Sequence, residues 1–194
     1  MSLKEQVYSV LVVCASEQFN RALPELFPLP AFSPVNVVSN VSAAKRAVAE
    51  RDFDFVIINS PLPDNTGIGF AVDTSASSST VVLFLARTEQ YLDAYDKLAE
   101  HGVFLMRKPF SRSMFEVAAG WLVSARERVR KTEKKTLSIE EKMNEIRLVN
   151  RAKWLLISEL KMTEPDAHRY IEKQAMDSCV QKRQIAEEII KTYG

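Results

Sequence analysis

The sequence is poor in cysteine, histidine and glycine, and each shortage excludes a class of site. Its only cysteines, Cys14 and Cys179, lie far apart, so we expect no disulfide framework and a reducing cytoplasm as the location. Two distant histidines and no carboxylate cluster predict neither a metal site nor a cofactor. No glycine-rich phosphate loop and no Ser/His/Asp set is visible, so we expect that the chain is not an enzyme.

Long apolar runs and a strong net charge are also missing. No N-terminal apolar stretch reaches the length of a signal peptide or a membrane span, so no membrane partner is expected. The formal net charge is +1, but it is unevenly distributed. Residues 1–110 carry 9 Lys or Arg and 12 Asp or Glu, whereas residues 111–194 carry 17 and 13. This mild asymmetry indicates that the two parts have different tasks.

Short apolar runs alternate with helix-like stretches in the first 110 residues. The runs are rich in Val, Ile and Phe, as strands buried on both faces of a parallel sheet are. Five strands alternating with helices predict an α/β fold with a five-stranded, doubly wound parallel sheet, which is flavodoxin-like. The expected strands are Val7–Cys14, Val35–Val38, Phe53–Ile58, Thr80–Leu85 and Val103–Met106, and the expected helices are Glu17–Leu26, Val41–Arg51, Ile68–Ala76 and Glu89–His101.

The composition changes after Pro109, where strong helix formers predominate and only one proline occurs. We predict a long helix followed by two short ones, with Thr163 as the N-cap of the first short helix. A weak heptad pattern, with Leu122, Ala125, Ile139 and Met143 among its positions, favours a homodimer through the long helix, in which the linker forms a coiled coil. The alternative is a long helix that lies on its own domain. The predicted domains are residues 1–122, a helical linker at 123–137, and an all-α three-helix domain at 138–194.

The front part resembles a response-regulator receiver domain over about residues 5–125. The resemblance rests on Val10–Val13, on the segment Phe55–Gly67 with its Leu-Pro-Asp element, and on Lys108-Pro109-Phe110. It implies the receiver fold and a cis peptide before Pro109. It also implies acyl-phosphate chemistry, in which a carboxylate after the third strand is phosphorylated beside a divalent cation.

The residues at the receiver pocket positions do not fit that chemistry. The acidic pair is replaced by Cys14 and Ala15, and the phosphoacceptor position holds Asn59, whose neutral amide is a poor nucleophile. The hydroxyl position holds Leu85, or Ala86 if the alignment slips by one, and only Lys108 matches. We therefore predict a degenerate, phosphorylation-incompetent pseudo-receiver, in which Lys108 hydrogen-bonds Asn59 or a loop carbonyl. A regulatory protein partner that docks on the receiver or the long helix would then supply the input.

The back part resembles an ANTAR domain over about residues 135–192. The matching elements are Ala152-Lys153-Trp154-Leu155-Leu156, Gln174-Ala175-Met176-Asp177 and Gln184–Ile190. ANTAR domains bind stem-loops in leader transcripts and prevent terminator formation. The combination with a receiver is similar to transcription antiterminators of the amidase and nitrate-assimilation regulator type.

RNA sites combine cations with planar groups that stack on loop bases. The candidates for RNA contact are Arg151, Arg169, Tyr170, Lys173, Lys182 and Arg183. Each has an ordinary alternative, because Tyr170 at helical spacing is commonly a core residue and basic residues on helices commonly face solvent. His168 is expected to be an exposed helix residue.

Two other functions remain open at this point. A DNA-binding response regulator would need a helix-turn-helix with a short turn, and no such turn occurs between Leu160 and Tyr193. A protein–protein adaptor without a nucleic-acid ligand is the second alternative. Binding assays with hairpin RNA and with duplex DNA distinguish the three functions, because an adaptor binds neither nucleic acid.

Overall fold

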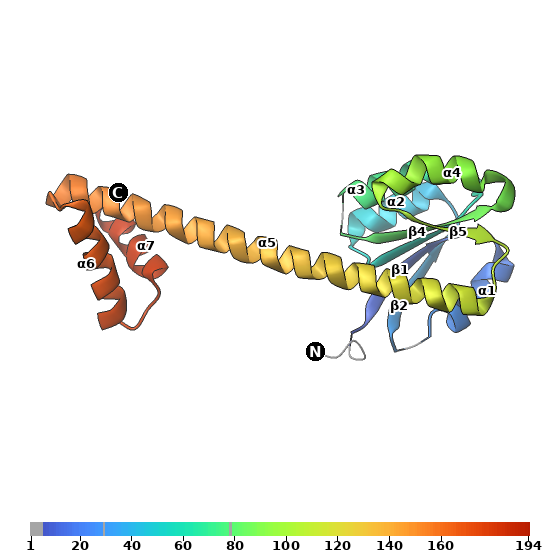
Figure 1. Cartoon of the computed structure of the whole chain (residues 1–194), viewed down its shortest axis with the longest axis horizontal. Helices are drawn as coiled ribbons and strands as arrows, with labels where there is room; N and C mark the ends of the chain where they lie inside the picture. Colours follow the sequence, from blue (N-terminus) through green and yellow to red (C-terminus); the bar gives the residue numbers. More distant parts are fainter. Residues whose placement is uncertain (1–5, 29, 78) are drawn as a thin grey trace. The chain divides into compact units, whose positions relative to one another are not determined.

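The computed structural model describes residues 6–28, 30–77 and 79–194, and the chain divides into two compact units, residues 1–130 and 131–194. The first unit is an α/β domain, shown with its elements in Figure 1. Its strands are β1 (Tyr8–Val13), β2 (Phe32–Val38), β3 (Phe55–Asn59), β4 (Val81–Arg87) and β5 (Phe104–Lys108). Its helices are α1 (Glu17–Leu26), α2 (Val41–Glu50), α3 (Ile68–Ser77), α4 (Tyr91–Leu98) and the first part of α5 (Arg112–Leu160), with short 3₁₀ turns η2 (Thr88–Gln90) and η3 (Ala99–His101).

All neighbouring strands pair in parallel in the order β2-β1-β3-β4-β5. This confirms the predicted five-stranded doubly wound sheet. The strand β2 is three residues longer than predicted, because it begins at Phe32 and contains Pro34. A proline without an N–H group is tolerated there since β2 lies at the edge of the sheet.

Helices cover both faces of this sheet, as Figure 1 shows, and each face has its own hydrophobic core. On one face α1 and α5 pack through Leu23, Phe115 and Leu122. On the other face α2, α3 and α4 pack through residues such as Ala44 and Phe70. The inner strands β1, β3 and β4 are buried on both faces, which is why they appear in the sequence as continuous apolar runs.

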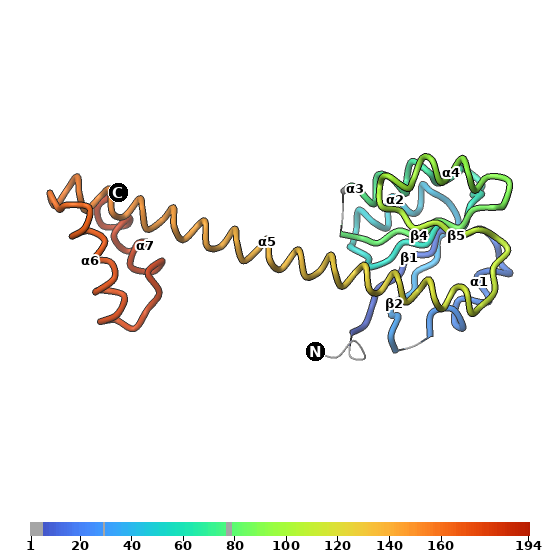
Figure 2. The backbone as a smooth tube through the Cα atoms, in the orientation of Figure 1, coloured from blue at the N-terminus to red at the C-terminus, as the bar shows by residue number. Residues whose placement is uncertain are grey.

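The second unit consists of the last part of α5, α6 (Glu164–Asp177) and α7 (Lys182–Tyr193), and Figure 2 traces its backbone. Thr163 caps α6 as predicted, because its side chain accepts a hydrogen bond from the backbone N–H of Asp166. Small and branched residues from the three helices form the core: Ala152, Leu156, Ala167, Ile171, Ala175, Ile185, Ala186 and Ile189. Tyr170, whose spacing allowed a core position, is instead 38% exposed.

The predicted heptad seam is only partly available for contact with a second chain. Leu122 is 2% exposed and packs in the core of the α/β unit, and Ala125 packs beside it. By contrast Ile139, Met143 and Ile146, which follow on the same helix, are about half exposed. The first seam positions therefore serve the unit's own core, and the later ones lie at the surface. No described helix is both long and apolar enough to cross a membrane.

Candidate functional site

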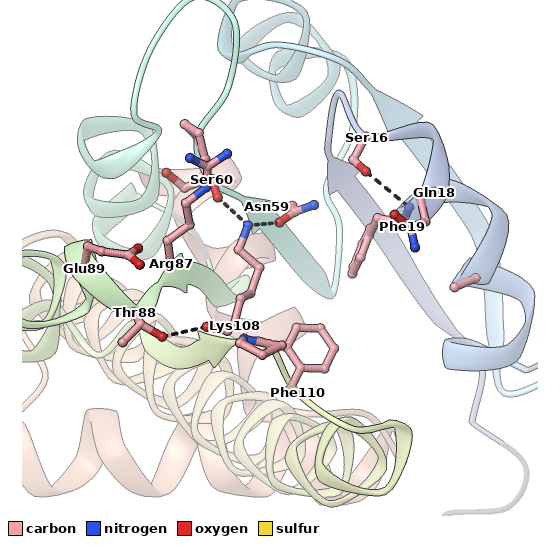
Figure 3. A pocket seen from close by; sticks show the side chains of 13 residues that line it. Ser16, Gln18, Phe19, Asn59, Ser60, Arg87, Thr88, Glu89, Lys108 and Phe110 are labelled. Carbon is pink, nitrogen blue, oxygen red and sulfur yellow. Dashed lines mark hydrogen bonds between the residues drawn. The ribbon is translucent and has the colours of Figure 1, made fainter.

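A pocket of about 690 Å³ lies at the carboxyl-terminal edge of the sheet, the edge where parallel α/β domains hold their ligands (Figure 3). The ends of β3, β4 and β5, together with the first turn of α1, place its walls. Its lining residues are Ser16, Gln18, Phe19, Ala22, Asn59, Ser60, Pro61, Arg87, Thr88, Glu89, Lys108, Pro109 and Phe110.

Lys108 lies in the middle of this pocket and points toward Asn59 and Ser60 (Figure 3). Its ammonium group donates to the Asn59 side-chain carbonyl and to the Ser60 backbone carbonyl, so it makes both of the contacts that were predicted as alternatives. The amide of Asn59 in turn donates to the Cys14 sulfur over 3.0 Å. Burial lowers the pKa of Lys108, and the charge of Arg87 lowers it further. Both acceptors of Lys108 are neutral, so its charge has no carboxylate partner among the described residues.

The other receiver positions lie outside the pocket lining. The Cys14 side chain is buried in the core below Asn59, and Ala15 is exposed. Leu85 pairs in register with Asn59 but is completely buried in the core on the α1 and α5 side. Neither it nor the buried Ala86 presents a group to the pocket. The peptide before Pro109 is cis, as the receiver resemblance implied.

The sequence indicated that Ser60 lies at this edge of the sheet, but it did not indicate Arg87 and Thr88, which line the pocket at the end of β4. Thr88 supplies a hydroxyl there, and it donates to the Lys108 backbone carbonyl over 2.9 Å. Its position follows from the register of β4 with β5, where Arg87 pairs with Lys108. The apolar runs predict where the strands lie in the sequence, but they do not predict which residues of neighbouring strands pair.

Asp64, which follows Asn59 in the loop after β3, caps α2 and does not line the pocket. It accepts hydrogen bonds from the backbone N–H groups of Val41 and Ser42 over 3.0 and 3.1 Å, and from the Ser42 hydroxyl. The bond from the Val41 N–H is the main cause of the lowered pKa of Asp64. Within residues 6–28, 30–77 and 79–194 no group of three or more His, Cys, Asp or Glu side chains is arranged to hold a metal ion.

In the helical unit, three of the predicted RNA-contact cations have carboxylate partners on the same unit. Arg169 bonds Asp166, Lys182 bonds Glu172, and Arg183 bonds Glu187. The side chains of these pairs are all at least 39% exposed, and solvent-exposed pairs contribute little to stability. The cations can therefore exchange these partners for phosphate at small cost. Tyr170 lies beside Arg169 on α6 and keeps part of its ring in solvent.

Arg151 and Lys173 are exposed, and no ion pair involves either of them in the described part of the chain. Arg151 belongs to a stripe on α5 that sequence reasoning did not identify. Arg147, Arg151 and Trp154 follow one another at spacings of four and three, which places them on one helix face. Trp154 is 72% exposed, an unusual position for the largest apolar side chain. The helical spacing of these three residues was visible in the sequence. Only the folded unit shows that the face that carries them is exposed to solvent.

A groove of about 410 Å³ lies between the helices of this unit, and it is lined mainly by basic and apolar groups. Its residues are Lys142, Glu145, Ile146, Val149, Asn150, Lys153, His168 and Lys182. They come from α5, α6 and α7, so the groove depends on the packing of all three helices. Of the predicted candidates only Lys182 lies here, and Lys142 and Lys153 were missed.

Comparison with known proteins gives matches to both units. Residues 138–190 match the ANTAR domain family. The "Transcriptional regulatory protein PdtaR" of Mycobacterium tuberculosis is 30% identical over 142 residues, which cover 73% of this chain and 69% of that protein.

Solved structures match the α/β unit. A signal receiver domain of an HD domain-containing protein from Pseudomonas fluorescens Pf-5 is 19% identical, with a TM-score of 0.57, over 64% of this chain and 92% of that one. A structure named as an adenylate cyclase from Rhodopirellula baltica is 17% identical, with a TM-score of 0.60, over 66% of this chain and 96% of that one. At these identities the likeness shows the fold alone. The chain therefore belongs to the ANTAR-domain transcriptional regulators, with a receiver-type domain in front of the ANTAR domain.

Proposed function

We propose that the protein is an RNA-binding transcription antitermination regulator that holds stem-loops of leader transcripts. The observation that carries this proposal is the ANTAR match over residues 138–190, which spans the three helices that form the basic groove. This function requires only that the protein binds the RNA, and it needs no catalytic step. The exposed cations would meet phosphates, and the exposed rings of Tyr170 and Trp154 would meet unpaired loop bases.

Single-stranded loops suit this surface better than duplex DNA does. A helix that reads the major groove presents its side chains to base edges and follows a short helix-turn-helix connection. Contrary to the expectation from the sequence, the α5–α6 and α6–α7 connections, residues 161–163 and 178–181, are as short as the turn of a helix-turn-helix, and Lys161 and Cys179 in them have left-handed backbones. The preference for RNA therefore rests on the exposed aromatic rings and not on the turns. An open aromatic face such as that of Trp154 stacks on a splayed base but has no partner inside a closed duplex.

The proposal is tested by mobility shifts of the full chain with a tandem-hairpin RNA and with a duplex DNA, each over a salt series. We expect shifts with the hairpin RNA that weaken steeply as salt increases, because released counterions drive phosphate binding. Binding of duplex DNA in preference to hairpin RNA would replace the proposal with a DNA-binding regulator. Binding of neither would leave the adaptor function.

The receiver-type domain of this regulator would work without phosphorylation. Asn59 provides no carboxylate, and its amide is held between Lys108 and Cys14. The sheet edge also lacks the acidic pair that a divalent cation requires. Input would then come from a ligand or from a regulatory protein partner.

We further propose that the chain acts as a homodimer through α5. The exposed Ile139, Met143 and Ile146 follow at spacings of four and three, as the seam of a two-stranded coiled coil does. Asn150 occupies the next seam position and is exposed, where a pair of asparagines would fix the register. Ile146 and Asn150 also line the groove, so a second chain would cover part of it, and each chain would present RNA with the face of α5 that carries Arg147, Arg151 and Trp154. A dimer would bring two such surfaces to a transcript that carries two hairpins.

A further inference from the structure

The pocket at the sheet edge combines unneutralised positive charge with an apolar wall. Lys108 and Arg87 both line it, and no ion pair joins either to a carboxylate in the described part of the chain. Glu89 is the one acidic residue of the lining. A pocket with two cations and one carboxylate has a net positive charge, and it is therefore suited to an anion.

The donors of this pocket are not all used. An ammonium group has three N–H donors, and Lys108 gives two of them to Asn59 and Ser60. Arg87 is exposed at the end of β4 and has five donors of its own. Holding a half-buried lysine between neutral carbonyls is unfavourable, and an anion beside it would offset part of that cost.

The opposite wall is apolar. Phe19 of α1 meets Phe110 edge to face, with ring centroids 6.5 Å apart, and Ala22 and Pro109 extend this wall. In Figure 3 the Phe110 ring lies below Lys108, and the polar groups of Asn59 and Ser60 lie above it. A bare inorganic ion would leave this wall uncovered, whereas an anion with an apolar body would cover it.

We propose that this pocket binds a small organic anion, whose charged head meets Lys108 and Arg87 and whose apolar body lies on Phe19 and Phe110. The replacement of the phosphoacceptor by Asn59 is what makes this possible, since a carboxylate at that position would pair with Lys108 and repel the ligand. The site thus supplies a non-covalent input in place of phosphorylation. It lies in the α/β unit and does not depend on RNA binding.

The pocket is connected to α5 through contacts between aromatic side chains. Phe110 also stacks on Phe115, with centroids 5.7 Å apart, and Phe115 is a completely buried residue in the first turn of that helix. A ligand that presses on Phe110 therefore acts on the residue that anchors the start of α5. The signal would be read in the same helix that carries the dimer seam.

The test is calorimetric titration of the full chain with phenyl phosphate and, separately, with inorganic phosphate. We expect phenyl phosphate to bind more tightly, because its ring replaces water on the apolar wall. The variant Arg87→Gln should weaken binding by about tenfold, the loss of one hydrogen bond to a charged group. Glu89→Gln should strengthen it by about twofold, since it removes an exposed like charge.

Arg107→Gln is the matched control. Arg107 precedes Lys108 on β5, but it lies over the Tyr91 ring, outside this pocket. The proposal predicts unchanged binding for this variant. All variants change exposed residues, and circular dichroism confirms that they fold. Absence of binding of phenyl phosphate at millimolar concentration would overturn the proposal. So would equal affinity for both probes, or affinity that the Arg87 and Glu89 variants leave unaltered.

Discussion

At the scale of single residues, Asp54 is the most highly connected carboxylate of the α/β unit. It precedes β3 and is 13% exposed at its side chain, where Arg126 and Arg130 of α5 contact it at 2.9 and 3.1 Å. The Ser9 backbone N–H and hydroxyl donate to the same carboxylate. Burial alone would raise the pKa of Asp54, but the Ser9 N–H, the hydrogen bond and charge of Arg126, and the Ser9 hydroxyl outweigh it and lower the pKa. Through these contacts Asp54 joins α5 to the amino-terminal edge of the sheet by ion pairs with Arg126 and Arg130.

The variant Asp54→Asn should destabilise the α/β unit by roughly 1.5–3 kcal/mol, because a hydrogen-bonded charge is lost from a mostly buried site. Since the folded pKa of Asp54 is depressed, its contribution is fully present above the unfolded value of about 3.9 and is lost as pH falls through the folded value. Urea unfolding between pH 6 and pH 3, roughly the range of carboxylate titration, measures this. The difference between wild type and variant should shrink as pH falls. A constant difference would contradict the assignment.

The same neighbourhood raises the pKa of Tyr8 to about 12, chiefly by burial and by its hydrogen bond to Glu127. Arg130 also lies over the Tyr8 ring, 5.6 Å from its centroid. We expect that Tyr8 stays protonated at about pH 10, where an unperturbed phenol ionises. Difference absorbance of the Tyr8→Phe variant and of wild type, recorded through the alkaline titration, identifies this tyrosine. Loss of a phenolate signal near pH 10 on removal of Tyr8 would contradict the account.

At the scale of the element, α5 carries different groups along its length. Its first turns pack on the sheet through Phe115 and Leu122, and its later turns expose apolar seam residues and then the Arg147–Arg151–Trp154 stripe. One helix thus serves as a core helix, as a proposed dimer seam and as part of the proposed RNA surface. Its sequence has no single hydrophobic period because each part packs against a different neighbour.

Removal of the Trp154 ring tests the stripe. Trp154→Ala should weaken binding of tandem-hairpin RNA by about 1–3 kcal/mol, the contribution of one stacked base, while Trp154→Phe retains most of the affinity. Trp121, the other exposed tryptophan, lies in the α/β unit, so Trp121→Ala is the control and should leave affinity unchanged. Equal affinities of the Trp154→Ala variant and wild type for RNA would exclude stacking at this residue and leave RNA binding elsewhere on the unit intact.

The positive charge of the same stripe should contribute to the salt dependence of RNA binding. Arg151→Gln removes a cation that has no ion-pair partner among the residues the structure describes, and we expect the slope of log K against log salt to decrease by about 1. Arg183→Gln removes a cation that is already paired with Glu187 at 2.8 Å, so its effect should be smaller. Filter binding over a salt series compares the two. A larger decrease of the slope for Arg183→Gln than for Arg151→Gln would contradict the order that the ion pairs predict.

At the scale of the whole molecule, the sequence predicted the fold well because the buried strands are short continuous apolar runs and several helices begin at a capping side chain, such as Ser16, Asn40 and Thr163. The three C-terminal helices were predicted for the same reason. The pocket was predicted only in part. Asn59 and Lys108 follow from the receiver resemblance, whereas Arg87 and Thr88 depend on strand register. The contacts of Asp54 with Arg126 and Arg130 join residues 72 and 76 positions apart, and no local pattern indicates them.

The RNA candidates show the same limit. The residue types were identified from the sequence, but pairing and exposure were not. Arg169 and Arg183 pair within one helical turn, which spacing can predict, whereas Lys182 pairs with Glu172 of another helix. Packing of α5, α6 and α7 is also what leaves Trp154 in solvent while Leu156 is buried. Such distinctions require the folded unit.

The most direct test of the central claim is ultraviolet crosslinking of the full chain to a library of tandem-hairpin RNAs with randomised loops, followed by mapping of the crosslinked peptides. The account predicts crosslinks within residues 138–193, with the peptide that contains Trp154 among them, and none within residues 6–110. Crosslinks confined to the α/β unit would contradict it. So would a complete absence of RNA crosslinks under conditions in which the same protein retains duplex DNA.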